Sequence, residues 1–374
     1  MRIGLLIYGS LDTLSGGYLY DRKLVEHLRQ AGDSVEIVSL PWRSYPAHLA
    51  DNLSLRLYRR LRDLPVDILL QDELNHPSLA LVNRRLRRLQ PRYPLISIVH
   101  HLRSSEQHPR RLLPLYRAVE RAYLRTVDGF IFNSRTTQQA VGELRGESEE
   151  ERGERENLAP LGGVVAYPAA DHLAVPEEGE AEELISARGS DAGPLRILFV
   201  GNLIARKGLH HLIAVLSRLP WASWRLDVVG DEAVDSAYAA AVRRQVGAAG
   251  LEENIRLHGR VSDDELAQRY RAAHLLAVLS YEGFGIVYLE AMAFGLPVLA
   301  SVHGGAGEIV DSGVNGFLVE PADADGIAAH VSALAGDRER LAVLGRNARR
   351  RYAFHPRWAD SAAAIRAYLE TCVQ

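Results

Sequence analysis

Short apolar segments alternate with longer amphipathic segments along most of this chain, and that alternation limits the possible folds more than any other feature. In the first half, strand-like segments occupy 2–8, 34–39, 66–71, 95–99, 128–132 and 163–166. Helical spacing of apolar residues fills the intervals, at 18–31, 50–62, 78–90, 110–125 and 134–145. Strands that alternate with helices form a parallel sheet covered on both faces, so we predict an α/β, doubly wound domain.

The alternation restarts after residue 194. Strands are expected at 195–200, 224–229, 255–258, 274–278, 297–301 and 317–319. Helices are expected at 207–218, 234–249, 263–272, 286–294, 306–311, 324–335, 338–352 and 357–373. Because 374 residues are many for one hydrophobic core, we predict two doubly wound domains that face each other across a cleft. Sheets of this kind bind ligands beyond the carboxyl ends of their strands, which in the first domain carry 9–17, 72–75, 100–106 and 133–134.

The composition along the chain suggests where one domain ends and the next begins. We expect a first domain over 1–175, in which the acidic run 146–160 forms a mobile loop. The acidic stretch 176–194 is expected to be a linker. The second domain is expected over 195–355, and the amphipathic helix in 356–374 is expected to return to the first domain.

Charge and cysteine content exclude several classes of protein. A single cysteine, Cys372, excludes a disulfide framework and a cysteine-rich zinc site. No apolar run approaches the roughly 20 residues that span a bilayer, so we expect a cytoplasmic protein.

Residues 1–145 carry 22 Lys and Arg against 14 Asp and Glu. That excess is typical of solvated helix faces, and it also fits an anionic acceptor or peripheral contact with an anionic membrane. No aromatic and basic motif for nucleic acid is present.

Two carboxylates enclose a Gly-Phe-Gly turn in the second domain. Glu282 precedes the turn, and Glu290 lies about one turn into the apolar helix that follows it. A buried carboxylate without a partner costs several kcal/mol, so Glu290 requires a partner from the protein or from a ligand. Gly295 and Pro297 end the helix.

Other strand ends in the second domain offer groups that could bind anions. After one strand, Gly201 allows close backbone approach, and Arg206 and Lys207 place two cations beside the start of a helix. This could be a diphosphate site or a cation pair on a loop with a structural glycine. The segment has neither G-x-G-x-x-G nor a P-loop. Residues 302–309 and 257–261 are further strand ends that fit either a ligand or an ordinary turn.

Several motifs together resemble a known family. In order, the chain contains G-N-x-x-x-R-K-G from Gly201, G-R-V-S-D-D-E-L from Gly259, E-G-F-G-I-V-Y-L-E from Glu282, and then H-G-G-A-G-E-I-V and N-G-F-L-V. Together with Gly16-Gly17 and the F-N-S-R motif from Phe132, this order and spacing resemble the family 4 retaining glycosyltransferases of the GT-B fold, whose two domains are Rossmann-like. The resemblance covers essentially the whole chain and is densest from 195 to 320.

The resemblance implies roles for particular residues. Arg206 and Lys207 would hold the diphosphate of a nucleotide sugar, and Glu282 would address the transferred sugar. His101 would lie near that sugar, although the neighbouring His100 fits the family pattern as well. Glu290 would take the ribose hydroxyls. Together the donor-binding positions implied are Gly16, Gly17, Gly201, Arg260, Val261, Gly283, Phe284, Gly285, Ile286 and Glu290.

The activity implied is the transfer of a hexose-type sugar from a UDP- or GDP-linked donor to a hydroxyl of an unidentified glycan, lipid or small molecule. We expect retention by same-face substitution, with no metal and no cofactor besides the donor. Positioned cations and amides would stabilise the departing diphosphate. The alternatives are another GT-B enzyme, such as a nucleotide-sugar epimerase, and a nucleotide-sugar-binding protein without turnover.

Overall fold

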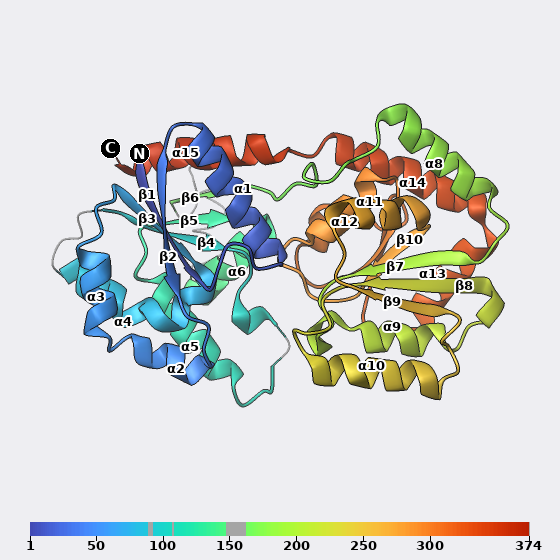
Figure 1. The fold of residues 1–374 in the computed structure, drawn as a ribbon, viewed down its shortest axis with the longest axis horizontal. Helices are drawn as coiled ribbons and strands as arrows, with labels where there is room; N and C mark the ends of the chain where they lie inside the picture. Colours follow the sequence, from blue (N-terminus) through green and yellow to red (C-terminus); the bar gives the residue numbers. More distant parts are fainter. Residues whose placement is uncertain (89–92, 107, 147–161, 374) are drawn as a thin grey trace. The chain divides into compact units, whose positions relative to one another are not determined.

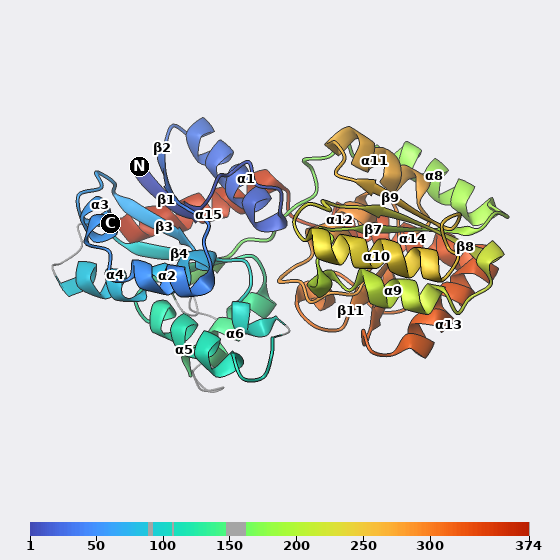
Figure 2. The same ribbon diagram turned by 60° about the horizontal axis from the view of Figure 1, so that its bottom comes forward.

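The computed structural model describes residues 1–88, 93–106, 108–146 and 162–373, and the chain divides into two compact units (Figures 1 and 2). Unit 1 contains Met1–Pro168 together with Pro356–Gln374, and unit 2 contains Ala169–His355. Each unit is built around one six-stranded sheet in which every pairing is parallel. Two doubly wound α/β domains, as the strand–helix alternation predicts, are therefore observed.

The sheet of unit 1 has the strand order β2-β1-β3-β4-β5-β6. Its strands are β1 (Arg2–Tyr8), β2 (Ser34–Leu40), β3 (Ile68–Asp72), β4 (Leu95–Val99), β5 (Gly129–Phe132) and β6 (Gly163–Val165). Strands β3, β4 and β5 are buried along their whole length, because helices cover both faces. The order changes direction between β1 and β3, and such a topological switch point is where sheets of this kind hold ligands.

Helices cover the two faces of this sheet. Helix α1 (Gly16–Gln30) and helix α15 (Trp358–Val373) lie together on one face, and α3 (Leu55–Arg62), α4 (His76–Arg88) and α5 (Leu113–Leu124) lie on the other (Figure 1). The remaining described elements of unit 1 are α2 (Tyr45–Asp51), η1 (Glu73–Asn75), η2 (Arg103–Ser105) and α6 (Arg135–Arg145). Helix α15 is fixed within unit 1 by the ion pair of Arg366 with Asp33, in which Nε lies 2.7 Å from Oδ2.

The sheet of unit 2 has the order β12-β11-β10-β7-β8-β9. Its strands are β7 (Leu195–Val200), β8 (Trp224–Val229), β9 (Ile255–Gly259), β10 (Leu275–Val278), β11 (Val298–Ser301) and β12 (Gly316–Val319). Here the order changes direction between β7 and β10, which are hydrogen-bonded neighbours. The carboxyl ends of these two strands therefore form the switch point of unit 2.

Seven helices of at least eight residues belong to the described part of unit 2. They are α8 (Glu178–Ser190), α9 (Leu209–Leu216), α10 (Ser236–Ala248), α11 (Asp263–Ala272), α12 (Ile286–Ala293), α13 (Ala324–Gly336) and α14 (Arg338–Ala353). Short 3-10 turns are η3 (Ala205–Lys207), η4 (Trp221–Ser223) and η5 (Gly305–Glu308). Helices α8, α11, α12 and α14 lie on one face of the sheet, and α9 and α10 lie on the other (Figures 1 and 2).

The expected linker over 176–194 is wrong, because most of it forms helix α8 within unit 2, which already begins at Ala169. Helix α8 has few buried apolar residues, and hydrogen bonds to distant parts of unit 2 stabilise it. The buried guanidinium of Arg188 donates to the carbonyl oxygens of Phe294, at 2.7 Å, and of Tyr270, at 3.1 Å. These carbonyls belong to the last turns of α12 and α11, where backbone acceptors are otherwise unpaired.

Two further expectations differ from the structure. The helix expected over 50–62 is divided into α2 and α3, because the Ser54 hydroxyl accepts a hydrogen bond from the Leu57 amide and starts a new helix. The helix expected over 306–311 is the short turn η5.

The acidic run 146–160 lies outside the described residues after Gly146. Across the described ranges, no helix combines the length and apolar character needed to cross a membrane.

Candidate active site

The switch point of unit 2 brings together the cations that follow β7 and the carboxylate that follows β10. Lys207 Nζ forms an ion pair with Glu282 Oε1, and each side chain is 15% exposed. The Ser280 hydroxyl donates to the same carboxylate oxygen at 2.5 Å. Burial alone would raise the pKa of the Glu282 carboxyl, but the charges of Lys207 and Arg206 hold it below its ordinary value. Glu282 is therefore a carboxylate near neutral pH.

The turn η3 places Arg206 beside this ion pair. Its Nη1 lies 3.5 Å from the carbonyl oxygen of Tyr281, the residue before Glu282. Gly201 has a φ of +156°, and a Cβ atom there would lie 3.5 Å from Cδ of Lys207. The backbone of Gly201 therefore runs along the stem of the lysine. Two cations and a carboxylate meet at the ends of two neighbouring strands, which is an arrangement suited to an anionic group that also carries hydroxyls.

The three residues of the Gly-Phe-Gly turn, Gly283, Phe284 and Gly285, are all buried. Phe284 is 1% exposed, so its side chain belongs to the core. Gly285 has a φ of +93° and precedes Ile286, the first residue of α12. A Cβ atom at Gly285 would lie 2.3 Å from the Tyr288 ring, which makes glycine necessary there. Gly285 therefore lets the chain turn directly into α12.

A second glycine loop packs directly on this turn. The amide of Gly305 donates to the carbonyl oxygen of Glu282 at 2.8 Å. A Cβ atom at Gly304 would lie 2.2 Å from the Glu282 oxygen, and one at Gly305 would lie 2.2 Å from the Gly283 oxygen. The loop after β11 therefore supports the turn after β10 through contacts that only glycine permits.

Glu290 has protein partners within unit 2. The Tyr270 hydroxyl donates to Glu290 Oε2 at 2.6 Å, and His172 Nε2 lies 3.3 Å from Oε1. The carboxylate is 5% exposed. The partner that the sequence requires for this residue is thus supplied at least in part by the protein. Arg260 is exposed and Val261 is half-buried beyond the edge strand β9, which β8 separates from β7.

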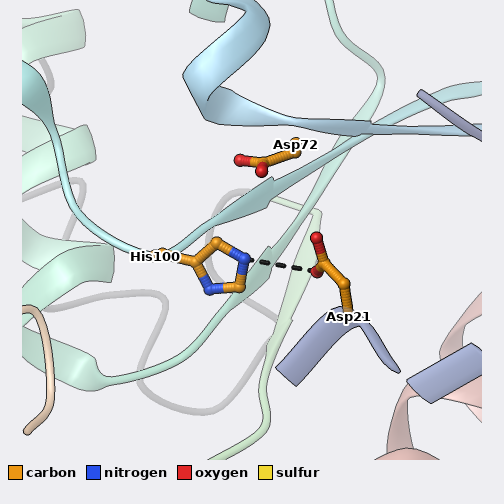
Figure 3. A group of neighbouring side chains, drawn as sticks. All are labelled: Asp21, Asp72 and His100. Atoms are coloured by element: carbon orange, nitrogen blue, oxygen red, sulfur yellow. Dashed lines mark hydrogen bonds and ion pairs between the residues drawn. The ribbon is translucent and has the colours of Figure 1, made fainter. Parts of the chain in front are cut away.

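The switch point of unit 1 contains a different set of groups (Figure 3). His100 follows β4, and its Nε2 lies 3.2 Å from Asp21 Oδ1 on α1. Asp72, the last residue of β3, points toward the same ring. Burial raises the pKa of Asp72 to about 7, and the neighbouring Asp21 adds to that shift.

The structure separates the environments of the two neighbouring histidines. Gly16 and Gly17 begin α1, and the atoms nearest to a Cβ atom at Gly17 all belong to His100, at 3.0 Å for Cδ2. His101 is half-buried and instead bonds Glu106, with its Nε2 2.8 Å from Oε1. His100 is therefore the histidine that lies against the Gly16-Gly17 loop.

A second buried group of titratable side chains follows β3. Its members are Glu73, His76 and Glu120, and burial raises the pKa of Glu73 to about 8 and that of Glu120 to about 7. Burial lowers the pKa of His76 to about 4. His76 Nδ1 lies 3.0 Å from the Glu73 carbonyl oxygen, and the Ser104 amide donates to Glu120. The neutral forms of these groups are thus favoured.

Each buried group of unit 1 has the composition of a small metal site. The ligand atoms of Asp21, Asp72 and His100 lie within 4.8 Å of one another, and so do those of Glu73, His76 and Glu120. The sequence singled out only His100 among these side chains, although it placed 72–75 on the same edge. Asp21 carried a usable signal, because it lies at helical spacing from the apolar residues Tyr18 and Leu24 and therefore on the buried face.

Comparison with known proteins agrees with this architecture. A family model described as "Glycosyl transferases group 1" matches residues 180–351, and one described as "Glycosyltransferase Family 4" matches residues 20–152. Among solved structures, sucrose-phosphate synthase from Thermosynechococcus elongatus is 22% identical with a TM-score of 0.79, covering 99% of this chain and 98% of that one. Anabaena HepE in complex with UDP and glucose is 21% identical with a TM-score of 0.74, covering 99% and 100%.

Curated relatives match over shorter segments. D-inositol 3-phosphate glycosyltransferase from Xylanimonas cellulosilytica is 36% identical over 199 residues, which are 51% of this chain and 46% of the relative. The GDP-mannose-dependent alpha-(1-6)-phosphatidylinositol monomannoside mannosyltransferase of Mycobacterium tuberculosis is 30% identical over 182 residues, which are 46% of each chain. The matched part of this chain thus spans about half the length of these relatives.

The two sheets, each made of parallel strands, and the similarity to the solved structures define a GT-B fold. The two family models together match most of the chain, one in each half. The chain belongs to glycosyltransferase family 4.

Proposed function

We propose that this protein is a retaining glycosyltransferase that moves a hexose-type sugar from a nucleotide-diphosphate sugar to an acceptor hydroxyl. The observation that carries the proposal is the contact of Lys207 with Glu282, beside Arg206, at the switch point of unit 2. These cations suit a diphosphate, and the ionised Glu282 suits the hydroxyls of a sugar. Membership of glycosyltransferase family 4 supports the same reaction.

The chemical work of these residues is electrostatic. Negative charge grows on the diphosphate as its bond to the sugar breaks, and Arg206 and Lys207 would stabilise that charge. Each such group contributes on the order of 3 kcal/mol to lowering the barrier. We propose that these cations take the place of a divalent metal, that the leaving phosphate accepts the acceptor proton on the same face, and that no cofactor besides the donor takes part.

The donor is proposed to be UDP- or GDP-linked. Two lines support this pair: HepE was solved with UDP and with UDP-glucose, and the mycobacterial mannosyltransferase is named for GDP-mannose. The acceptor is proposed to be a glycan, a lipid or a small molecule with a free hydroxyl. The excess of arginine in residues 1–145 is compatible with an anionic acceptor or an anionic membrane surface.

The decisive experiment replaces Lys207 with alanine. A panel of UDP- and GDP-sugars is assayed for nucleotide release with the parent protein, with Lys207→Ala and with Lys23→Ala. Lys23 pairs with Glu26 on the exposed side of α1, so it is a matched control for the loss of one lysine. We expect Lys207→Ala to lower kcat/KM about 100- to 1,000-fold and Lys23→Ala to leave it unchanged.

Three outcomes would contradict the proposal. Full turnover in Lys207→Ala would remove the diphosphate role of this residue. Loss of turnover on chelation, restored by Mg²⁺, would remove metal independence. A product with inverted anomeric configuration, detected by NMR, would remove retention.

A further inference from the structure

Asp21 and His100 form a buried pair at the switch point of unit 1 that the proposed function has not used. We propose that Asp21 is a positioning residue that holds the His100 ring as an imidazolium, with Nε2–H turned into the protein and Nδ1–H left to donate to a substrate oxygen. The substrate part of this inference rests on the proposed glycosyltransferase function, whereas the state of the ring does not.

The ring of His100 is held from several sides. Its Nε2 lies 3.2 Å from Asp21 Oδ1, and the two side chains are 9% and 0% exposed (Figure 3). The edge of the Tyr20 ring contacts it, with 5.2 Å between ring centroids. The side-chain amide of Asn133 donates to the His100 carbonyl oxygen at 2.7 Å, which fixes the main chain of His100. A ring fixed in this way keeps one orientation before substrate arrives.

The two nitrogens of the ring have different surroundings. Nε2 faces Asp21, whereas among the described residues no hydrogen bond reaches Nδ1. Gly17 lies along the Cδ2 edge, where the absence of a side chain lets α1 begin against the ring. The partner of one imidazole nitrogen decides what the other can do. With Nε2 bonded to a carboxylate, Nδ1 is the atom left for a ligand.

The charges around the ring favour its protonated form. Facing it are Asp21 from α1, Asp72 from the end of β3 and Glu73 from η1, whereas the segment after β5 presents the neutral Asn133. Asp21 Oδ2 is buried and accepts no hydrogen bond from the described residues. Burial is the largest single influence and alone would lower the pKa of His100, but the charge and hydrogen bond of Asp21, together with Asp72 and Glu73, raise it above its ordinary value.

A bound metal ion is the competing occupant of this group, because its ligand atoms lie within 4.8 Å of one another. A metal would need the lone pair of a histidine nitrogen, and Nε2 is the nitrogen within reach of Asp21. A proton shared between Nε2 and Oδ1 satisfies both atoms at the observed 3.2 Å. We therefore assign the site to a proton and keep the metal as an outcome of the test.

The experiment compares the full-length parent with Asp21→Asn, which preserves shape and removes charge. The pKa of His100 is measured by NMR titration of the imidazole nitrogens, with His100→Gln identifying the signal. Removing the charge should lower this pKa by about one unit, the size of effect expected from an opposite charge within about 4–6 Å. The high-pH limb of kcat/KM against pH should move down by the same amount, with near-parental rates at low pH.

Two further variants keep the inference testable. Asp67→Asn removes an exposed aspartate that pairs with Arg2, and it should shift neither the pKa nor the pH profile. Asp72→Asn leaves the bond between Asp21 and His100 in place, and it should lower the pKa of His100 by less than about one unit. This second variant serves if Asp21→Asn fails to fold.

Distinct results would overturn the inference. If Asp21→Asn lowers the rate equally at every pH and leaves the pKa of His100 unchanged, Asp21 only supports the fold. If elemental analysis finds one equivalent of metal in the parent and none in Asp21→Asn, the site holds metal. If the pKa of His100 shifts as expected but no nucleotide sugar supports turnover, the proposed function is wrong, whereas the role of Asp21 in holding the His100 ring is retained.

Discussion

The two switch points of this molecule have the same strand topology but balance their buried charges with different side chains. In unit 2 the loops after β7 and β10 supply Lys207 and Glu282, so each buried charge meets its opposite on the chain. In unit 1 the corresponding position contains Asp21 and Asp72, and the imidazole of His100 is the cation that faces them. The charge of unit 2 is therefore permanent near neutral pH, whereas that of unit 1 depends on the protonation of an imidazole, which neighbouring groups control.

This difference shows how parallel sheets can offer either a fixed or a tunable site. A lysine and a carboxylate keep their charges over a broad pH range, which suits binding to an anion that is always charged. A histidine among carboxylates changes its charge with small changes in its surroundings, which suits donation of a hydrogen bond at one stage of a reaction.

The largest effect should come from breaking the ion pair of unit 2. Glu282→Gln and Lys207→Met should each lower kcat/KM about 100- to 1,000-fold. Because the two groups act as one unit, the double variant should be scarcely worse than either single variant. Steady-state kinetics of all four proteins checks this. Losses that multiply would show that Lys207 and Glu282 act independently.

Adding a methyl group to a glycine should damage unit 2 more than unit 1. Gly305→Ala places Cβ 2.2 Å from a backbone oxygen, and the loop cannot yield cheaply, so we expect a loss of about 3 kcal/mol. Gly17→Ala meets only the ring edge of His100, at 3.0 Å, so the free energy of unfolding should fall by less than about 1 kcal/mol. Its transferase activity should fall by more than this loss of stability explains. Denaturant unfolding measures the stability of both variants, and the transferase assay measures their activity.

Gly179→Ala is the matched control for these two variants. Gly179 lies in α8 with no atom within 4 Å of the added Cβ. It should be neutral or stabilise by about 0.5–1 kcal/mol, as alanine does in helices. An equal loss in Gly17→Ala and Gly305→Ala would show that the Gly17 loop is as rigid as the turn after β10.

Removing the carboxylate of Glu290 should weaken binding of the free nucleotide diphosphate. Glu290→Ala should cost about 1.5–3 kcal/mol if the carboxylate takes the ribose hydroxyls, which is roughly 10- to 100-fold in affinity. Calorimetric titration with UDP and GDP measures this, with the exposed Glu253→Ala as control. Unchanged affinity together with a lower melting temperature would assign Glu290 to the core through Tyr270 and His172.

The last prediction concerns how stability depends on pH. The pKa of Glu73 rises from its ordinary value to about 8 in the folded protein, so the folded state holds a proton that the unfolded state releases. Glu73 therefore costs stability as pH rises from about 4 toward 8. Glu282, with its lowered pKa, contributes stability that is present above its ordinary value and lost as pH falls.

Hydrogen exchange at pH 5, 6.5 and 8 can separate the two units. We expect Glu73→Gln to protect unit 1 relative to the parent at pH 8 and to make little difference at pH 5. Exchange in unit 2 should be the same in both proteins at every pH. If Glu73→Gln is equally protective at pH 5 and pH 8, the carboxyl does not change its protonation over this range.

Local pattern predicted the strands closely, and apart from the regions of 50–62, 176–194 and 306–311 the predicted elements agree with the observed ones to within three residues at each end. Helix α8 was missed because its buried residues are few and its stabilising contacts come from Arg188, about 80 to 110 residues away from the carbonyls it reaches. Burial lowers the pKa of Arg188 to about 9, and the hydrogen bonds to those carbonyl acceptors offset part of this cost.

The candidate site was predictable where its residues directly follow strands. Arg206, Lys207 and Glu282 follow strands that the alternation located, and a parallel sheet brings such ends to one edge. The pairing of Asp21 with His100 spans 79 residues, and that of Tyr270 with Glu290 depends on how α11 packs beside α12. Pairings of this kind follow from tertiary packing and leave no trace in local spacing.

Helix α15 belongs to unit 1 although it is the last element of the chain, and this affects the order in which the protein can be made. Unit 2 is one continuous stretch, Ala169–His355, that can complete its core as soon as it leaves the ribosome. Unit 1 begins first yet must wait for α15, whose Arg366 pairs with Asp33. A released chain truncated before Pro356 would therefore contain a complete unit 2 and an incomplete unit 1.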